Sequence, residues 1–215
     1  SGTATVYKAE HPETGIAAVK VLRTRLAQDP VAIKRFLREA EFGTRVNHPN
    51  IVKTYTYGQT EDLYYLAMEW VEGEALEKFA IRSGQLAPAL VSHIIEQIGG
   101  ALTAAHGQGI IHRDLKPANI QYNPETQRAV LLDFGIARDA DLKPEERLTR
   151  TGFFVGTLQY VAPEALSGEL VSEQADVYSL ATIAYYLLTS ALPYNGRSPR
   201  ELFQQLLTQP PTPLN

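Results

Sequence analysis

A run of polar residues lies between two apolar segments in the middle of the 215-residue chain. It reads Ile111-His112-Arg113-Asp114-Leu115-Lys116-Pro117-Ala118-Asn119-Ile120. Fourteen residues after Asn119, Asp133 follows the apolar residues 130–132. Carboxylate and amide oxygens suit Mg²⁺, a carboxylate can accept a proton, and an ammonium can stabilise negative charge. Two polar turns that contain aspartates by chance are the simpler interpretation. That interpretation is weak, because the five specified letters of H-R-D-x-K-x-x-N would occur by chance with odds of about 10⁻⁴.

These residues resemble the catalytic motifs of the eukaryotic-type (Hanks-type) protein kinases, in particular the Ser/Thr kinases of that type in bacteria. Further matches follow in the order of the family. Ala18-Val19-Lys20 matches the lysine motif of the third strand, and Glu39, 19 residues later, stands where the family has the glutamate that pairs with this lysine. Residues 156–164 match the end of the activation segment, and residues 176–179 match the start of the central helix. The resemblance runs from about residue 5 to residue 215.

The resemblance implies an enzyme that transfers the γ-phosphate of ATP to Ser/Thr hydroxyls of proteins. The transition state of this reaction is loose and anionic, so the protein must position groups and supply positive charge. Lys20 would hold the α- and β-phosphates, and Glu39 would hold the Lys20 ammonium in place. Asp114 would accept or orient the proton of the attacking hydroxyl, and Lys116 would neutralise the γ-phosphate. Lysine at this position resembles the Ser/Thr-specific branch of the family.

The resemblance also implies metal and nucleotide ligands. Asn119 and Asp133 would bind Mg²⁺, or Mn²⁺ in its place, through hard oxygen atoms. The carbonyl of Glu69 and the amide of Val71 would bond the edge of the adenine. The residues expected to contact ATP are Gly2, Val6, Ala18, Lys20, Met68, Glu69, Val71 and Gln121.

Regulation by phosphorylation is implied as well. Family members with arginine before the catalytic aspartate, as Arg113 stands here, generally require a phosphorylated activation loop. Thr149 and Thr151 lie in that loop and are the expected sites of autophosphorylation. Arg35 and Arg138 are placed to join Arg113 in a pocket for the phosphothreonine. Solvated loop threonines and surface arginines are the alternative interpretation.

Some positions depart from the family. Ala4 replaces a glycine of the phosphate-binding loop, and Gln121 replaces the apolar floor under the adenine, where we expect its amide to lack a partner. Gly43 replaces an apolar side chain that joins the lobes, for which Phe42 could compensate. These departures leave a pseudokinase open, acting as a nucleotide-binding or scaffolding module. A kinase of small molecules is a third alternative, against which the activation-segment match argues.

Composition narrows the possible functions. The chain has 20 Lys and Arg against 24 Asp and Glu, a net charge of −4, and so lacks the basic face that nucleic acid requires. It has no cysteine, which excludes disulfides and thiolate nucleophiles and fits a reducing compartment. Residues 177–194 carry no charge, but they are expected to form a buried helix rather than a membrane span. We expect a cytoplasmic protein, or the cytoplasmic domain of a larger, membrane-anchored one. Its expected partners are protein substrates and a second copy of itself.

The pattern of strands and helices expected along the chain predicts an α+β, two-lobed fold, which must position these residues. Residues 1–71 are expected to form a small β-rich lobe with one helix beginning at Asp29-Pro30. Residues 72–215 are expected to form a larger helical lobe that lacks its last helices. The expected strands are 5–9, 16–22, 51–57 and 63–71, and the expected long helices are 90–106, 177–188 and 199–207.

Overall fold

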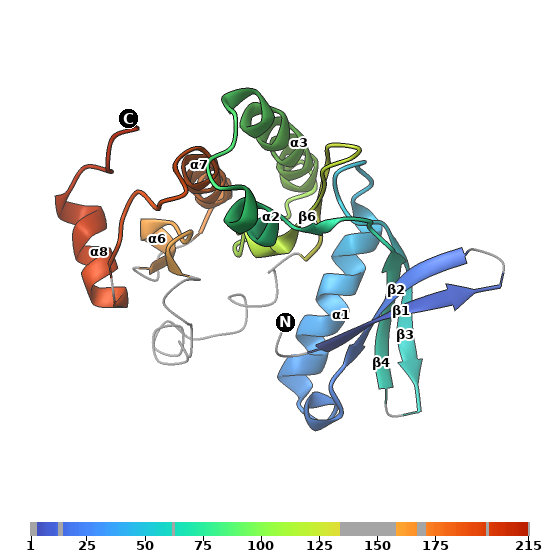
Figure 1. The fold of residues 1–215 in the computed structure, drawn as a ribbon. Helices are drawn as coiled ribbons and strands as arrows, with labels where there is room; N and C mark the ends of the chain where they lie inside the picture. The colour runs from blue at the N-terminus through green and yellow to red at the C-terminus, as the bar shows by residue number, and fades with distance from the viewer. Residues whose placement is uncertain are drawn as a thin grey trace.

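The structure is a computed structural model. It describes residues 4–12, 15–61, 63–133, 158–166, 171–196 and 198–214. A twisted sheet with one long helix forms the first part, and a group of helices forms the second (Figure 1). The chain passes from one to the other through residues 70–73.

An antiparallel four-stranded sheet forms the first part, in the order β1-β2-β4-β3. Its strands are β1 Ala4–His11, β2 Gly15–Leu22, β3 Thr54–Thr60 and β4 Leu63–Glu69. The register places Lys20 of the inner strand β2 between Val6 of β1 and Leu66 of β4. A lysine in the middle of a sheet is therefore held by strands on both sides.

Helix α1, Pro30–Arg45, packs against this sheet and follows a short 3₁₀ turn, η1 Thr24–Leu26. It begins where the sequence predicts, because the Asp29 carboxylate accepts a hydrogen bond from the Val31 amide at 2.9 Å and Pro30 occupies the first turn. Phe36 and Ala40 are buried in the core of the first part. Glu39 lies next to Ala40, at the side of the helix that faces the sheet.

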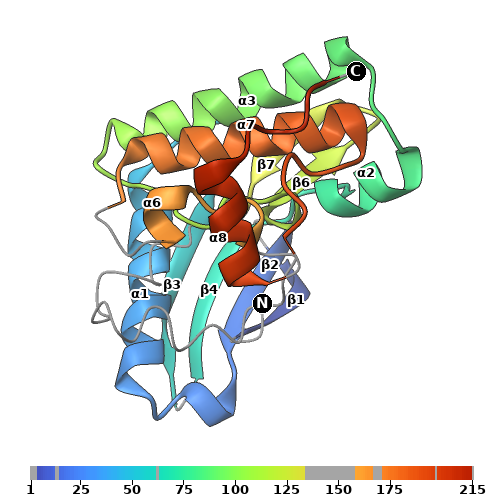
Figure 2. The ribbon, with the colours of Figure 1, turned by 90° about the vertical axis from the view of Figure 1, so that its left-hand side faces the viewer.

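The second part is mostly helical, with a small sheet of order β5-β6-β7 at its junction with the first. Its elements are β5 Glu74–Ala75, α2 Leu76–Ser83, α3 Pro88–His106, η2 Pro117–Asn119, β6 Ile120–Asn123, β7 Arg128–Leu131, α6 Pro163–Leu166, α7 Glu173–Thr189 and α8 Pro199–Thr208. Helices α3 and α7 lie side by side (Figure 2). Ile94 and Ile98 of α3 and Ile183 and Leu187 of α7 are fully buried in the shared core.

Residues 177–189 of the uncharged stretch belong to α7, as expected for a core helix, and residues 190–194 follow the helix. The helix starts earlier than predicted, at Glu173, and one side of it is open, since Val177 is 59% exposed. In the described part of the chain, no helix is long and apolar enough to cross a membrane.

The predicted strand 51–57 is wrong at its start. The strand begins at Thr54, because Ile51 and Val52 leave the first sheet and pair with β7 instead. The Val52 amide donates to the Leu131 carbonyl at 2.9 Å, and the Leu131 amide donates to the Asn50 carbonyl at 2.8 Å. Ile51 is buried in the core of the second part and Val52 in that of the first, so this short segment joins the two cores.

Candidate active site

Lys20 lies at the centre of the candidate site and is only 4% exposed. Its Nζ atom lies 2.5 Å from Glu39 Oε1 and 3.0 Å from Asp133 Oδ1. Strand β2, helix α1 and the residues after β7 each supply one of these side chains. Two residues that the sequence places 19 and 113 positions from Lys20 therefore meet at one ammonium group.

Two carboxylates share this single ammonium, which shifts all three pKa values. Burial raises the pKa of Glu39 to about 7, and the neighbouring Asp133 charge adds to the rise against the opposing effect of Lys20. Burial alone would raise the pKa of Asp133, but the Lys20 ammonium outweighs it and holds this pKa below its usual value. Burial alone would lower the pKa of Lys20, but the two carboxylates raise it above the usual range for lysine. Lys20 and Asp133 thus form a charged pair near neutral pH, while Glu39 sits near its titration point.

A buried carboxylate on α7 anchors the loop that contains Asp114. Asp176 is fully buried and accepts hydrogen bonds from the amide of His112 at 2.8 Å and the amide of Arg113 at 2.9 Å. Its Oδ2 atom also lies 2.8 Å from His106 Nε2 at the end of α3. Arg113 has a φ of +65°, a left-handed conformation that is uncommon for a residue other than glycine. Asp176 satisfies the amides of this turn and so fixes where the next residue, Asp114, points.

The side chains of Asp114, Lys116 and Asn119 converge within this loop. Lys116 Nζ lies 3.1 Å from Asp114 Oδ2. The Asn119 side-chain nitrogen donates to the Asp114 carbonyl at 2.8 Å, so the amide oxygen is the end that can face a cation. The loop therefore presents a carboxylate, an ammonium and an amide oxygen next to one another.

The donor set fits Mg²⁺. The Leu132 amide donates to the Asn119 carbonyl at 2.9 Å, which brings Asp133 beside the loop of Asn119. Among the residues that the structure describes, no three His, Asp or Glu side chains gather into a metal cluster. One carboxylate and one amide oxygen suit Mg²⁺, which usually binds few protein ligands together with waters and substrate phosphates.

The residues expected around the adenine lie at the junction of the two parts. Ala18 of β2 pairs with Met68 of β4, and both are buried, as is Val71. Val6 of β1 is 55% exposed. The expectation that the Gln121 amide lacks a partner is wrong, because its Nε2 atom donates to the Val71 carbonyl at 3.4 Å. Pairing of β6 with β5 places Gln121 directly beneath this connection.

Gly43 lies against β3 rather than beside a gap. A Cβ atom there would lie 2.2 Å from Thr54 Oγ1, so a larger residue would force the Thr54 side chain to move. Phe42 packs against the core of the second part. Thr54 thus occupies the space beside Gly43, while Phe42, from a helix of the first part, contacts the core of the second part as its compensating role predicts.

Two of the three predicted phosphate-pocket arginines are described. Arg35 Nε and Nη2 and Arg113 Nε are buried without a hydrogen-bond partner in the described chain. Buried donors without partners are costly and suit a site that receives an anion. Gly2, Arg138, Thr149 and Thr151 lie outside the described residues.

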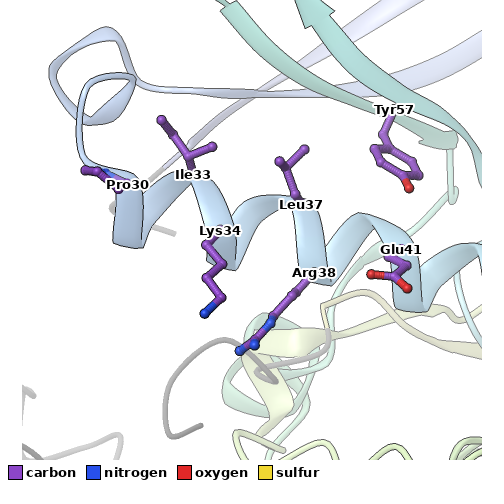
Figure 3. A pocket seen from close by; sticks show the side chains of 7 residues that line it. All are labelled: Pro30, Ile33, Lys34, Leu37, Arg38, Glu41 and Tyr57. Atoms are coloured by element: carbon purple, nitrogen blue, oxygen red, sulfur yellow. The ribbon is translucent and has the colours of Figure 1, made fainter. Parts of the chain in front are cut away.

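A pocket on the outer face of α1 is separate from this site. Ile33 and Leu37 project from the side of the helix on which Tyr57 of β3 lies, and Lys34 and Arg38, which also line the pocket, project from the other side (Figure 3). These residues occupy a different face of α1 from Glu39, so the pocket contains none of the side chains that contact Lys20.

Sequence reasoning missed two contributors to the site, His106 and the carboxylate of Glu69. His106 is a single histidine at the end of a helix, a position that gives no sign of its contact with Asp176. Glu69 was assigned only a main-chain role, but its side chain contacts Arg128, a residue that no motif singles out.

Comparison with known proteins matches the protein kinase domain family over residues 2–213. Serine/threonine-protein kinase pkn3 of Myxococcus xanthus is 39% identical over 203 residues, which are 92% of this chain and 37% of that protein. Serine/threonine-protein kinase PknA of Mycobacterium tuberculosis is 38% identical over 202 residues, 92% of this chain and 46% of that protein. The chain thus spans less than half the length of these two curated relatives.

Solved structures agree with these matches. The crystal structure of Rad53 1-466 in complex with AMP-PNP superposes with a TM-score of 0.74 at 31% identity, over 95% of this chain and 50% of that chain. The PknI kinase domain of Mycobacterium tuberculosis, a C20A_R136A double mutant, gives a TM-score of 0.70 at 32% identity, over 91% of this chain and 71% of that chain. The expected α+β fold, with a sheet-rich first lobe and a helical second lobe, is confirmed.

Proposed function

The chain belongs to the protein kinase domain family, with Ser/Thr protein kinases as relatives along more than nine tenths of its length, and from this premise we propose that it is an active Ser/Thr kinase. It would transfer the γ-phosphate of ATP to Ser/Thr hydroxyls of proteins. The observation that carries this proposal is the simultaneous contact of Lys20 with Glu39 and Asp133. A lysine held by two carboxylates at one ammonium is a preorganised positive centre for phosphate oxygens.

The proposed reaction divides the work among the residues of the site. The substrate hydroxyl oxygen attacks the γ-phosphorus, its proton passes to the Asp114 carboxylate, and ADP leaves. Lys116 lies 3.1 Å from Asp114 and is placed to stabilise charge on the phosphoryl group in transfer. Lys20 holds the remaining phosphates. Asn119 and Asp133 would hold Mg²⁺, which when bound neutralises phosphate charge.

The nucleotide would lie between the two parts of the chain. Ala18 and Met68 supply buried apolar contacts, and the main chain of Glu69 and Val71 supplies an acceptor and a donor for the adenine edge. We propose a cytoplasmic location for this activity, because ATP would be the substrate and the lack of cysteine fits a reducing compartment. The chain could act alone or as the cytoplasmic domain of a longer protein. Its partners would be protein substrates and a second copy of itself.

Transfer of labelled phosphate tests the proposal. The 215-residue chain is incubated with ATP labelled at the γ-phosphate, Mg²⁺ and casein, alongside an Asp133→Asn variant. The proposal expects label on casein or on the chain itself with the parent protein and none with the variant. Nucleotide binding without any transfer would instead assign the chain to the scaffolding alternative.

The proposed activity includes control by autophosphorylation of Thr149 and Thr151. The buried nitrogens of Arg35 and Arg113, which have no hydrogen-bond partner among the described residues, support an anion site, and Arg138 would be its third member. A phosphothreonine carries about −1.5 to −2 charges and can bond several guanidinium groups at once. Mass spectrometry after incubation with ATP should find phosphate on one or both threonines, and a Thr149→Ala/Thr151→Ala variant should lose activity. Full activity in that variant would refute this part of the proposal.

A further inference from the structure

Arg128, the first residue of β7, contacts two segments of the first part of the chain at once. Its Nη1 atom donates to Glu69 Oε1 at 2.8 Å, at the end of β4. Its Nη2 and Nε atoms donate to the Pro49 carbonyl at 2.9 and 3.3 Å, in the loop that follows α1. One guanidinium of the second part therefore joins the end of strand β4 to the loop that follows α1 in the first part.

Glu69 is itself bonded to the same loop. The Glu69 amide donates to the Lys53 carbonyl at 2.8 Å, and the Lys53 amide lies 3.4 Å from Glu69 Oε2. The Glu69 carboxylate thus lies between the Arg128 guanidinium and the main chain of Lys53. The position of the carboxylate is therefore fixed from both sides. This also fixes the main chain of residues 69–71, which leads out of strand β4.

The loop has a second attachment to β7. The Asn50 side-chain nitrogen donates to the Ala129 carbonyl at 2.8 Å and to Gln97 Oε1 at 2.8 Å. The Gln97 oxygen in turn accepts from the Ala129 amide at 2.9 Å. The loop would therefore remain attached to β7 without Arg128, whereas the Glu69 carboxylate would lose its contact with β7.

We propose that Arg128 is a positioning residue for the nucleotide. By holding the Glu69 carboxylate against the loop after α1, it sets the main chain of residues 69–71, whose carbonyl and amide groups face the adenine. This inference rests on the proposed kinase function, because it assigns Arg128 a role in binding ATP. Arg128 acts through Glu69, and the groups that contact the phosphates and the hydroxyl are Lys20, Asp114 and Lys116.

The exposure of the pair favours positioning over stability. The side chains of Arg128 and Glu69 are 40% and 24% exposed, and ion pairs near the surface add little to the free energy of unfolding. Fixing a main-chain donor and acceptor before the ligand arrives lowers the cost of ordering them on binding. The expected effect of losing the pair is therefore on nucleotide affinity rather than on folding.

The test compares Arg128→Gln, Glu69→Gln and the double variant with the parent chain. Arg82→Gln is the matched control, because Arg82 also pairs with a glutamate, Glu74, but within the second part of the chain. We expect Arg128→Gln to raise the KM for ATP and the Kd for ADP by about three- to tenfold. The kcat should stay within twofold of the parent value, and the melting temperature should stay within about 2 °C of it. The double variant should bind ADP no more weakly than the weaker-binding of the two single variants, and Arg82→Gln should bind it as the parent does.

Several results would overturn the inference. A parent chain that transfers phosphate, with an Arg128→Gln variant of unchanged KM and Kd, refutes the positioning role. A fall in kcat and melting temperature at constant KM shows a structural role instead. If Arg128→Gln does not fold, Glu69→Gln and Arg128→Lys decide, and unchanged ADP affinity in both refutes the role. A parent chain that neither binds ADP nor transfers phosphate refutes the proposed function itself, a result distinct from the others.

Discussion

Replacing Glu39 with glutamine removes one of the two carboxylates that share the Lys20 ammonium. The Glu39 pKa is raised in the folded protein, from an ordinary value of 4.5 to about 7, so between these values the folded chain binds more protons than the unfolded chain. The free energy of unfolding therefore falls as pH rises through this range. Ionised Glu39 thus works against the stability of the fold while it holds Lys20 in place.

The two pKa values set the size of the effect. Linkage gives a loss of about 2–3 kcal/mol from Glu39 between pH 5 and pH 8. Other groups do not affect the comparison. The depressed pKa of Asp133 and the raised pKa of Lys20 place their titrations below pH 5 and above pH 8, and burial lowers the pKa of His112 in the parent and the variant alike. Glutamine cannot ionise, so the variant should lack this loss.

Urea unfolding at pH 5, 6, 7 and 8 measures the effect on the parent chain and on Glu39→Gln. The stability of the variant relative to the parent should increase by about 2–3 kcal/mol across this range. With m-values of about 2–3 kcal/mol per molar urea, the relative shift in midpoint is roughly 1 M. The variant should also transfer phosphate more slowly, because Lys20 loses a partner. A stability difference that does not change with pH would refute the assignment of the raised pKa to Glu39.

Three further substitutions test other contacts. Asp176→Asn should lower the free energy of unfolding in urea by at least about 3 kcal/mol, because a buried carboxylate that accepts two main-chain hydrogen bonds is replaced by an amide that also donates. Glu173→Gln serves as the control, and a loss under about 1 kcal/mol for Asp176→Asn would contradict the anchoring role. Gln121→Leu should leave the ADP affinity measured by calorimetry equal or improved, since the lost hydrogen bond to Val71 is long at 3.4 Å and leucine adds apolar contact. A tenfold loss of affinity would show that this hydrogen bond positions Val71. Gly43→Ala should cost about 1–2 kcal/mol because of Thr54, and Thr54→Ala should rescue most of that loss; failure to rescue would place the clash elsewhere.

The sequence predicted the parts of the site that depend on residue type and spacing. Lys20, Glu39 and Asp133 could be found because they match motifs of the family that the chain resembles, and the chemistry of those motifs restricts the residue types that fit. The helix start at Asp29-Pro30 was predictable because capping is local. The start of the strand at Thr54 could not be predicted, because residues 51–52 pair with β7 and this pairing depends on two cores that meet only in the folded chain.

Contacts between distant residues of ordinary type could not be predicted. Arg128 follows a polar turn and resembles any exposed charged residue, yet its guanidinium meets Glu69, 59 positions away. Gln121 was expected to lack a partner, because nothing local reveals that the Val71 carbonyl lies within reach. In both cases the partner is set by how β6 and β7 pack beneath the connection between the two parts, which is a property of the whole fold.

The central claim is that the ammonium of Lys20 is the preorganised positive centre for phosphoryl transfer. The rate of γ-phosphate transfer, measured for the parent chain, Lys20→Met and Lys78→Met, tests it most directly. Lys78 serves as the control because it is an exposed lysine of α2 to which no role in the site is assigned. We expect Lys20→Met to fold and to lose at least about 10²–10³-fold in rate, and Lys78→Met to match the parent. A folded Lys20→Met variant that transfers phosphate within a few-fold of the parent rate would contradict the claim.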